Sequence, residues 1–202
     1  MAITFPLSFP TATGIQEIEW ISENSVATTE SPWSKKIKVY DNGGKRWRVN
    51  ITLPSMTVAN GRIWRAWLLA LNGMEGTFWL SPTLDKTARG IATGTPLVNG
   101  GSQTGQSLVT DGWTTSQTGI LKAGDWFQLG NYLYQVMQDA NSDVSGNATF
   151  DIWPNLRSSP SDNDALTVIN PKGLFRLASL PPVNMTVNHL VEGLQFQAIE
   201  AI

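Results

Sequence analysis

The sequence of 202 residues has no cysteine, a single histidine and little charge. Without cysteine, neither a disulfide framework nor a thiolate zinc site can form. The 14 basic residues are scattered among 16 acidic ones, which gives a net charge of −2 and argues against a nucleic-acid partner. No stretch approaches the roughly 18 apolar residues of a membrane span, and the N-terminus lacks the features of a secretory signal peptide. We therefore expect a protein that is made in the cytoplasm and does not insert into a membrane.

Signatures of catalysis and of cofactor binding are also missing. His189, the only histidine, is not accompanied by a nucleophile motif such as G-x-S-x-G. Residues 139–146 begin like a calcium loop with D-x-N-x-D, but Phe150 stands at the twelfth position, where a bidentate Glu is required. Turn formation explains these polar residues equally well. We expect no enzyme activity, no metal site and no cofactor.

A helix is the clearest element in the sequence. Apolar residues cover most sides of residues 58–72, and Asn72-Gly73 supplies a C-terminal stop, because glycine tolerates the left-handed conformation. A strand with alternating apolar residues precedes the helix at residues 47–53, and another follows it at residues 76–80. We expect this strand–helix–strand segment to be the folding nucleus.

The rest of the sequence predicts short strands separated by turns. Residues 1–34 are expected to be irregular apart from one strand at residues 15–21. Residues 36–40 are expected to pair with residues 46–53 as a hairpin, with the turn at residues 42–43 (Asn-Gly). Further strands are predicted at residues 125–129, 132–138, 148–153, 166–169, 173–177 and 185–202.

The order of these strands predicts two units and a mainly β fold. Residues 1–85 plus 174–202 are expected to form a β-sandwich domain with one α-helix, because the last strands return to the first unit. Residues 86–173 are expected to form an inserted small β-barrel or β-sandwich domain. Charged residues make up only 15% of the chain, against about a quarter in typical proteins, which suits a surface that neighbours cover.

Two sets of residues are candidates for contact with other molecules. The predicted helix has one mostly polar stripe, in which arginine favours an interface because guanidinium groups make several directed hydrogen bonds. A solvated helix face is the alternative. Most of the nine tryptophans are expected in the core, but two lie in polar surroundings and are candidate exposed anchors. The predicted oligomer interface is Arg62, Arg65, Leu69 and Asn72, and the candidate anchors are Trp33 and Trp113.

The sequence around the helix resembles a known family. W-R-V-N-I-T-L-P at residues 47–54, the helix, and N-G-M-E-G-T-F-W-L at residues 72–80 resemble the N-terminal domain of distal tail proteins from long-tailed bacteriophages. The middle of the chain is similar to an insertion in many phage and prophage minor tail proteins. The matching pieces there are residues 103–105, 111–113, 121–125, 146, 154–157 and 175–177. The resemblance covers most of residues 36–202.

The resemblance implies a structural protein of the phage virion, assembled in the host cytoplasm. Its first unit would be a belt domain that forms a hexameric ring, with the insert projecting outwards. The ring would join the tail tube protein to the tip hub proteins of the baseplate. A second class of function is a carbohydrate-binding module that uses exposed aromatic residues, with host surface carbohydrate as its partner. The two functions could coexist in one protein.

Overall fold

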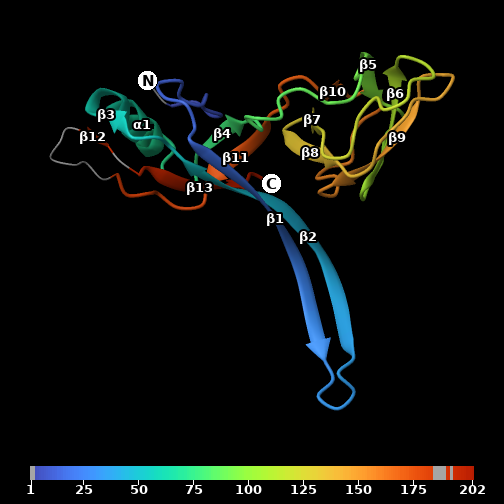
Figure 1. Ribbon diagram of the computed structural model, residues 1–202, viewed down its shortest axis with the longest axis horizontal. Coiled ribbons are helices and arrows are strands. Elements are labelled where there is room, and N and C mark those ends of the chain that lie inside the picture. The colour runs from blue at the N-terminus through green and yellow to red at the C-terminus, as the bar shows by residue number, and fades with distance from the viewer. Residues whose placement is uncertain (1–2, 184–189, 192) are drawn as a thin grey trace.

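Two large antiparallel sheets, a small two-stranded sheet and one helix are found in the computed structural model, which describes all residues except 1–2, 184–189 and 192 (Figure 1). The mainly β fold expected from the sequence is confirmed. The first sheet has five strands in the order β1-β2-β13-β11-β4. These strands are β1 (Glu17–Glu30), β2 (Ile37–Thr52), β13 (Gln195–Glu200), β11 (Gly173–Leu177) and β4 (Thr77–Leu80).

The second sheet has six strands in the order β10-β7-β8-β9-β6-β5. A bridge between Leu97 and Ala165 brings β5 next to the segment that leads into β10, so this sheet curls almost into a barrel. The expected hairpin about residues 130–131 is present as β7 and β8. The strands are β5 (Gly94–Val98), β6 (Ser107–Trp113), β7 (Trp126–Leu129), β8 (Tyr132–Val136), β9 (Ala148–Trp153) and β10 (Leu166–Thr167).

The predicted helix is confirmed as α1 (Val58–Ala70), which packs on the first sheet. Thr57 caps its N-terminus, since the threonine side-chain oxygen accepts a hydrogen bond from the Asn60 N–H. The chain leaves the helix through Asn72, whose φ of 48° is left-handed. Beside the helix lies a small two-stranded sheet of β3 (Met56–Thr57) and β12 (Leu190–Val191).

The N-terminal residues hold more structure than expected, because residues 17–30 form all of β1. The preceding segment covers the helix and the far edge of the sheet. The ring N–H of Trp64 donates to Thr13 Oγ1, and that of Trp67 donates to the Ser8 carbonyl, each at 2.9 Å. At the edge strand β4, the Leu7 N–H donates to the Thr77 carbonyl at 2.8 Å. The strand predicted at residues 15–21 is confirmed over residues 17–21, and the expectation of irregular structure is wrong for residues 22–30.

The hairpin expected between residues 36–40 and 46–53 does not form. Both segments lie in one strand, β2, which pairs along its length with β1. Asn42-Gly43, expected to be the turn, lies instead in an irregular part of that ladder, where Gly43 has a φ of 72°. The 16-residue strand β2 satisfies more backbone groups against β1 than a short local hairpin would. The long-range ladder thus overrides the local turn signal.

The two sheets meet at a joint made of tryptophans. The Trp47 ring lies 4.7 Å from that of Trp126 and 4.1 Å from that of Trp153, measured between centroids, so β2 packs against β7 and β9. A buried ion pair crosses the same joint, because Arg157 Nη2 lies 2.5 Å from a carboxylate oxygen of Glu200. The base of β2 therefore belongs to the first sheet and packs against the second. The strand β13 lies between β2 and β11, as expected for a returning C-terminus, while residues 185–189 of that prediction lie outside the described residues.

Candidate assembly surfaces

The β1–β2 hairpin continues far beyond the sheet and projects into solvent (Figure 1). We call residues 24–44 the arm. The strand pairing holds along it from Val26 with Asp41 to Glu30 with Ile37. Every residue of the arm is exposed except Ser31, which is half-buried in the turn. The arm therefore has no core of its own, although its backbone ladder is continuous from the Val26–Asp41 pair outwards.

One face of the arm carries exposed apolar side chains between polar and charged ones. Ile18, Trp20 and Val26 alternate along β1 and share a face, since strand side chains have a period of two. Ile37 and Val39 of β2 pair with residues on that same face and are 63% and 61% exposed. At the base this face packs against the core, through Ile18 and Trp20. In the arm nothing among the described residues covers it.

The end of the arm, residues 31–38, is basic and carries an aromatic ring; we call it the tip. Trp33 is 94% exposed, as the sequence predicts. Lys35 pairs with Glu30 at 3.0 Å, and the Lys38 ammonium lies 5.6 Å from the centroid of the Tyr40 ring. The tip thus presents an indole and unneutralised positive charge to solvent.

Ion pairs fix the arm where it leaves the sheet. Glu23 contacts Arg46 and Arg48, each with a nitrogen–oxygen distance of 2.5 Å. The hydrogen bond from Arg46, against a smaller opposing effect of burial and with help from Arg48, lowers the pKa of the Glu23 carboxyl. The carboxylate is therefore ionised at neutral pH. These pairs cross from β1 to β2 just before the arm begins, so they hold the two strands together there.

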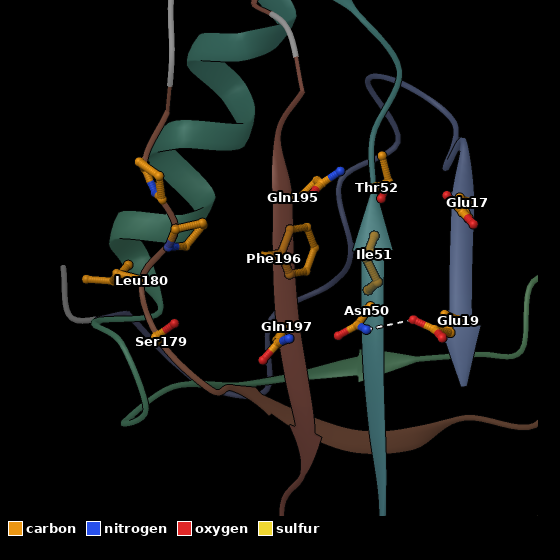
Figure 2. Close-up of a pocket in the computed structure, with 12 residues that line it drawn as sticks. Glu17, Glu19, Asn50, Ile51, Thr52, Ser179, Leu180, Gln195, Phe196 and Gln197 are labelled. Atoms are coloured by element: carbon orange, nitrogen blue, oxygen red, sulfur yellow. Dashed lines mark hydrogen bonds between the residues drawn. The ribbon is translucent and has the colours of Figure 1, made fainter. Parts of the chain in front are cut away.

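The outer face of the first sheet carries an open groove of about 430 Å³ (Figure 2). Glu17 and Glu19 lie on β1 at one side, and both are exposed. Glu19 accepts a hydrogen bond from the Asn50 side-chain amide at 2.7 Å. The opposite side is apolar. The lining residues are Glu17, Glu19, Asn50, Ile51, Thr52, Ser179, Leu180, Pro181, Pro182, Gln195, Phe196 and Gln197.

Three of the four candidate interface residues lie on one exposed face of α1, and the fourth, Asn72, lies two residues beyond the end of the helix. Arg62, Arg65, Leu69 and Asn72 are all exposed, Leu69 to 61%. A smaller groove of about 320 Å³ separates this face from Leu180. The face is basic where the groove beside β1 is acidic. Its role as an oligomer contact stays a prediction.

The expectation that Trp113 is an exposed anchor is wrong, because this residue is only 4% exposed. Gly112, with a φ of 73°, interrupts the alternation of β6 and turns Trp113 inwards. The indole N–H donates to Thr110 Oγ1 at 2.9 Å, and the ring packs edge-on against Phe150. Of the two tryptophans, only Trp33 remains available to a partner.

The loop that begins like a calcium site uses its polar side chains to bind backbone N–H groups, some of them in a neighbouring loop. Oxygens of Asp139, Asn141 and Asp143 accept hydrogen bonds from backbone N–H groups. Hydrogen bonds from Asn147 lower the pKa of the Asp143 carboxyl. Within the described part of the chain, no group of three or more His, Cys, Asp or Glu side chains is placed to hold a metal ion. His189 lies outside the described residues.

Sequence reasoning missed the arm and the groove. The arm carries one signal that could have revealed a strand, which is the β-branched content of residues 26–29. The groove carries none, because β1, β2 and β13 contribute to it from distant parts of the chain.

Comparison with protein-family models and with curated proteins finds no match for this chain. No helix among the described residues is long and apolar enough to cross a membrane. The arm, the groove and the helix face are therefore interpreted from their own geometry and charge.

Proposed function

We propose that the protein is a structural subunit that assembles with copies of itself, as a ring component of a bacteriophage tail tip. The observation that supports this function is the arm, a long hairpin that projects from the body with both faces exposed. The resemblance to distal tail proteins agrees with it. The expected assembly is a ring, hexameric in that family, which joins the tail tube protein to the tip hub in the virion.

The arm has the physical character of a segment that is completed by a partner. A two-stranded hairpin is at best marginally stable in water without a third strand or a packed face. The apolar side chains Val26, Ile37 and Val39 are 47–63% exposed along one face of this hairpin. Its strands also have unpaired edges, and such edges readily add another strand. A neighbour that covers the arm would bury these apolar side chains and pair with the free strand edges.

The two edges of the first sheet support the same interpretation. At one edge, β4 is covered by the N-terminal segment, since Leu7 hydrogen-bonds on both sides of Phe78. At the other edge, β1 is open along its 14 residues among the described part of the chain. A sheet with one covered edge and one long open edge fits a subunit that binds neighbours in one direction.

A carbohydrate-binding module, the alternative function, requires exposed aromatic rings beside polar groups. Trp113 is buried, which removes the aromatic candidate from the second sheet. Trp33 stands alone at the tip of the arm. We therefore favour assembly.

Removing the arm tests this function directly. Replacing residues 25–44 with Asn-Gly joins Asn24 to Lys45, which are register partners, through a two-residue turn. Because the deleted residues bury no core side chain, the shortened protein should still unfold cooperatively, with a melting temperature close to that of the parent monomer. Light scattering should show a monomer where the parent forms a defined oligomer. A parent that stays monomeric at high concentration and never joins a larger particle would overturn the proposed function.

A further inference from the structure

The tip and the groove have complementary chemistry. The tip offers Trp33 together with Lys36 and Lys38, and the groove offers Glu17 and Glu19 on one side. Among the described residues, neither glutamate has an ion-pair partner. Opposite charges placed on two separate surfaces of one chain suit an interface between copies of that chain.

The shape of the groove suits the tip as well. Leu180 lies across from the glutamates (Figure 2), and together with Pro181 and Pro182 it lines the groove with an apolar surface against which an indole can pack. Between the two sides, amides of β2 and β13 form a polar floor that can hydrogen-bond an indole N–H. The volume of about 430 Å³ lies within the range of roughly 300–1,000 Å³ that ligand-sized sites occupy.

A chain cannot place its own tip in its own groove. Glu19 and Glu30 lie on the same strand, 11 residues apart in sequence, and an extended strand of this length spans about 35 Å. The paired strands of the arm hold the tip at this distance from the groove of the same molecule. The tip can therefore meet a groove only on another molecule.

We propose that the tip of one copy binds in the groove of the next, with Trp33 against the Leu180–Pro182 side and Lys36 and Lys38 against Glu17 and Glu19. This inference rests on the proposed function and identifies its contact. Tip and groove are different surfaces, so the contact is heterologous, and repeated rotation closes it into a ring or continues it as a filament. The exposed face of α1 is a less suitable receptor because Arg62 and Arg65 would repel the tip.

A charge exchange between two variants tests the proposal. The tip variant is Lys36→Glu with Lys38→Glu, and the groove variant is Glu17→Lys with Glu19→Lys. Each variant alone brings like charges together at every contact, which should weaken self-association by roughly tenfold or more per pair. Mixed in equal amounts, they restore opposite charges at every contact, so the mixture should assemble where neither component does. Restoration by mixing cannot come from misfolding.

A matched control uses Lys86→Glu with Lys172→Glu, two exposed lysines outside both surfaces, and should assemble like the parent. Analytical ultracentrifugation of each variant and of the mixture gives the comparison. If arm removal abolishes assembly while the tip and groove variants assemble normally, the proposed function stands and this contact is wrong. If Arg62→Glu with Arg65→Glu abolishes assembly and the groove variant does not, the receptor is the helix face instead. If the parent never assembles, both proposals fail.

Discussion

The base and the outer half of the β1–β2 hairpin share two antiparallel strands, with a shift of register between the halves, yet only the base is packed. At the base, Trp47 and Val49 are 5% and 0% exposed. In the arm, Ile37 and Val39 on the same strand are more than half exposed. The difference lies in what the rest of the chain supplies, which is a full core at one end and nothing at the other.

This contrast teaches that strand formation and strand packing are separate matters. The ladder of backbone hydrogen bonds runs through both halves, so the arm needs no core to have its shape. Burial of apolar area is the larger stabilising effect, and only the base receives it from this chain. We infer that stability resides in the base and assembly in the arm, and substitutions in the two halves should separate these properties.

The largest contrast is expected between the two tryptophans of the hairpin. Trp47→Ala removes a ring that packs on Trp126 and Trp153 and a ring N–H that donates to the Leu133 carbonyl at 3.1 Å. The loss should be about 3–5 kcal/mol, which lowers the melting temperature by roughly 10 °C in a protein of this size. Trp33→Ala should change stability by less than about 0.5 kcal/mol and instead weaken self-association.

Calorimetry and light scattering on both variants check this contrast. Trp47→Phe, which keeps an aromatic ring, should lie between the parent and Trp47→Ala in melting temperature. A large fall in the melting temperature of monomeric Trp33→Ala would contradict the division, since it would mean that the tip packs on its own body.

A smaller contrast is expected between two valines of β2. Val49→Ala empties space in the core, because Val49 is fully buried, and should cost about 2 kcal/mol. Val39→Ala should cost less than about 0.5 kcal/mol in dilute protein. At concentrations where the parent assembles, Val39→Ala should cost more, because contact with a neighbour stabilises the folded state by mass action. Denaturant unfolding of the parent and of Val39→Ala, at low and at high protein concentration, measures this difference in the free energy of unfolding. Equal costs for Val39→Ala at both concentrations would exclude the apolar face of the arm from the interface.

The sequence predicted the packed parts of the molecule better than the exposed ones. The alternation of residues 47–53 and the period of residues 58–72 arise from burial, so a pattern of apolar residues records them. Residues 24–30 bury nothing and therefore show no such pattern. The Asn42-Gly43 signal failed because a turn is a local preference, whereas the pairing of β2 with β1 is set by many contacts far apart in sequence.

The candidate surfaces divide in the same way. The exposed helix face followed from the periodicity of one element, and Trp33 from its polar neighbours. Trp113 was misjudged because one glycine with positive φ changes which side of β6 it occupies. The groove was beyond sequence reasoning, since it requires the register of three strands. The division of the chain at residues 86–173 stays a prediction about independent folding.

The smallest expected effect lies at Glu23, on the boundary between base and arm. Glu23→Gln keeps the size of the side chain but removes the charge that Arg46 and Arg48 share. Because the carboxylate is partly exposed, the cost at neutral pH should be below about 1 kcal/mol, and it should shrink further in high salt.

The pH dependence of this cost follows from the direction of the pKa shift. The folded-state pKa of Glu23 is lowered from an ordinary value of 4.5, so its stabilising effect is present above that value and is lost as the pH falls through the folded pKa. The melting temperatures of the parent and Glu23→Gln should therefore differ at pH 7 and converge well below pH 4.5. NMR titration of the Glu23 carboxyl gives the pKa directly. A difference that persists unchanged in acid would show that Glu23 holds the arm through packing, and that the base is not fixed there by charge.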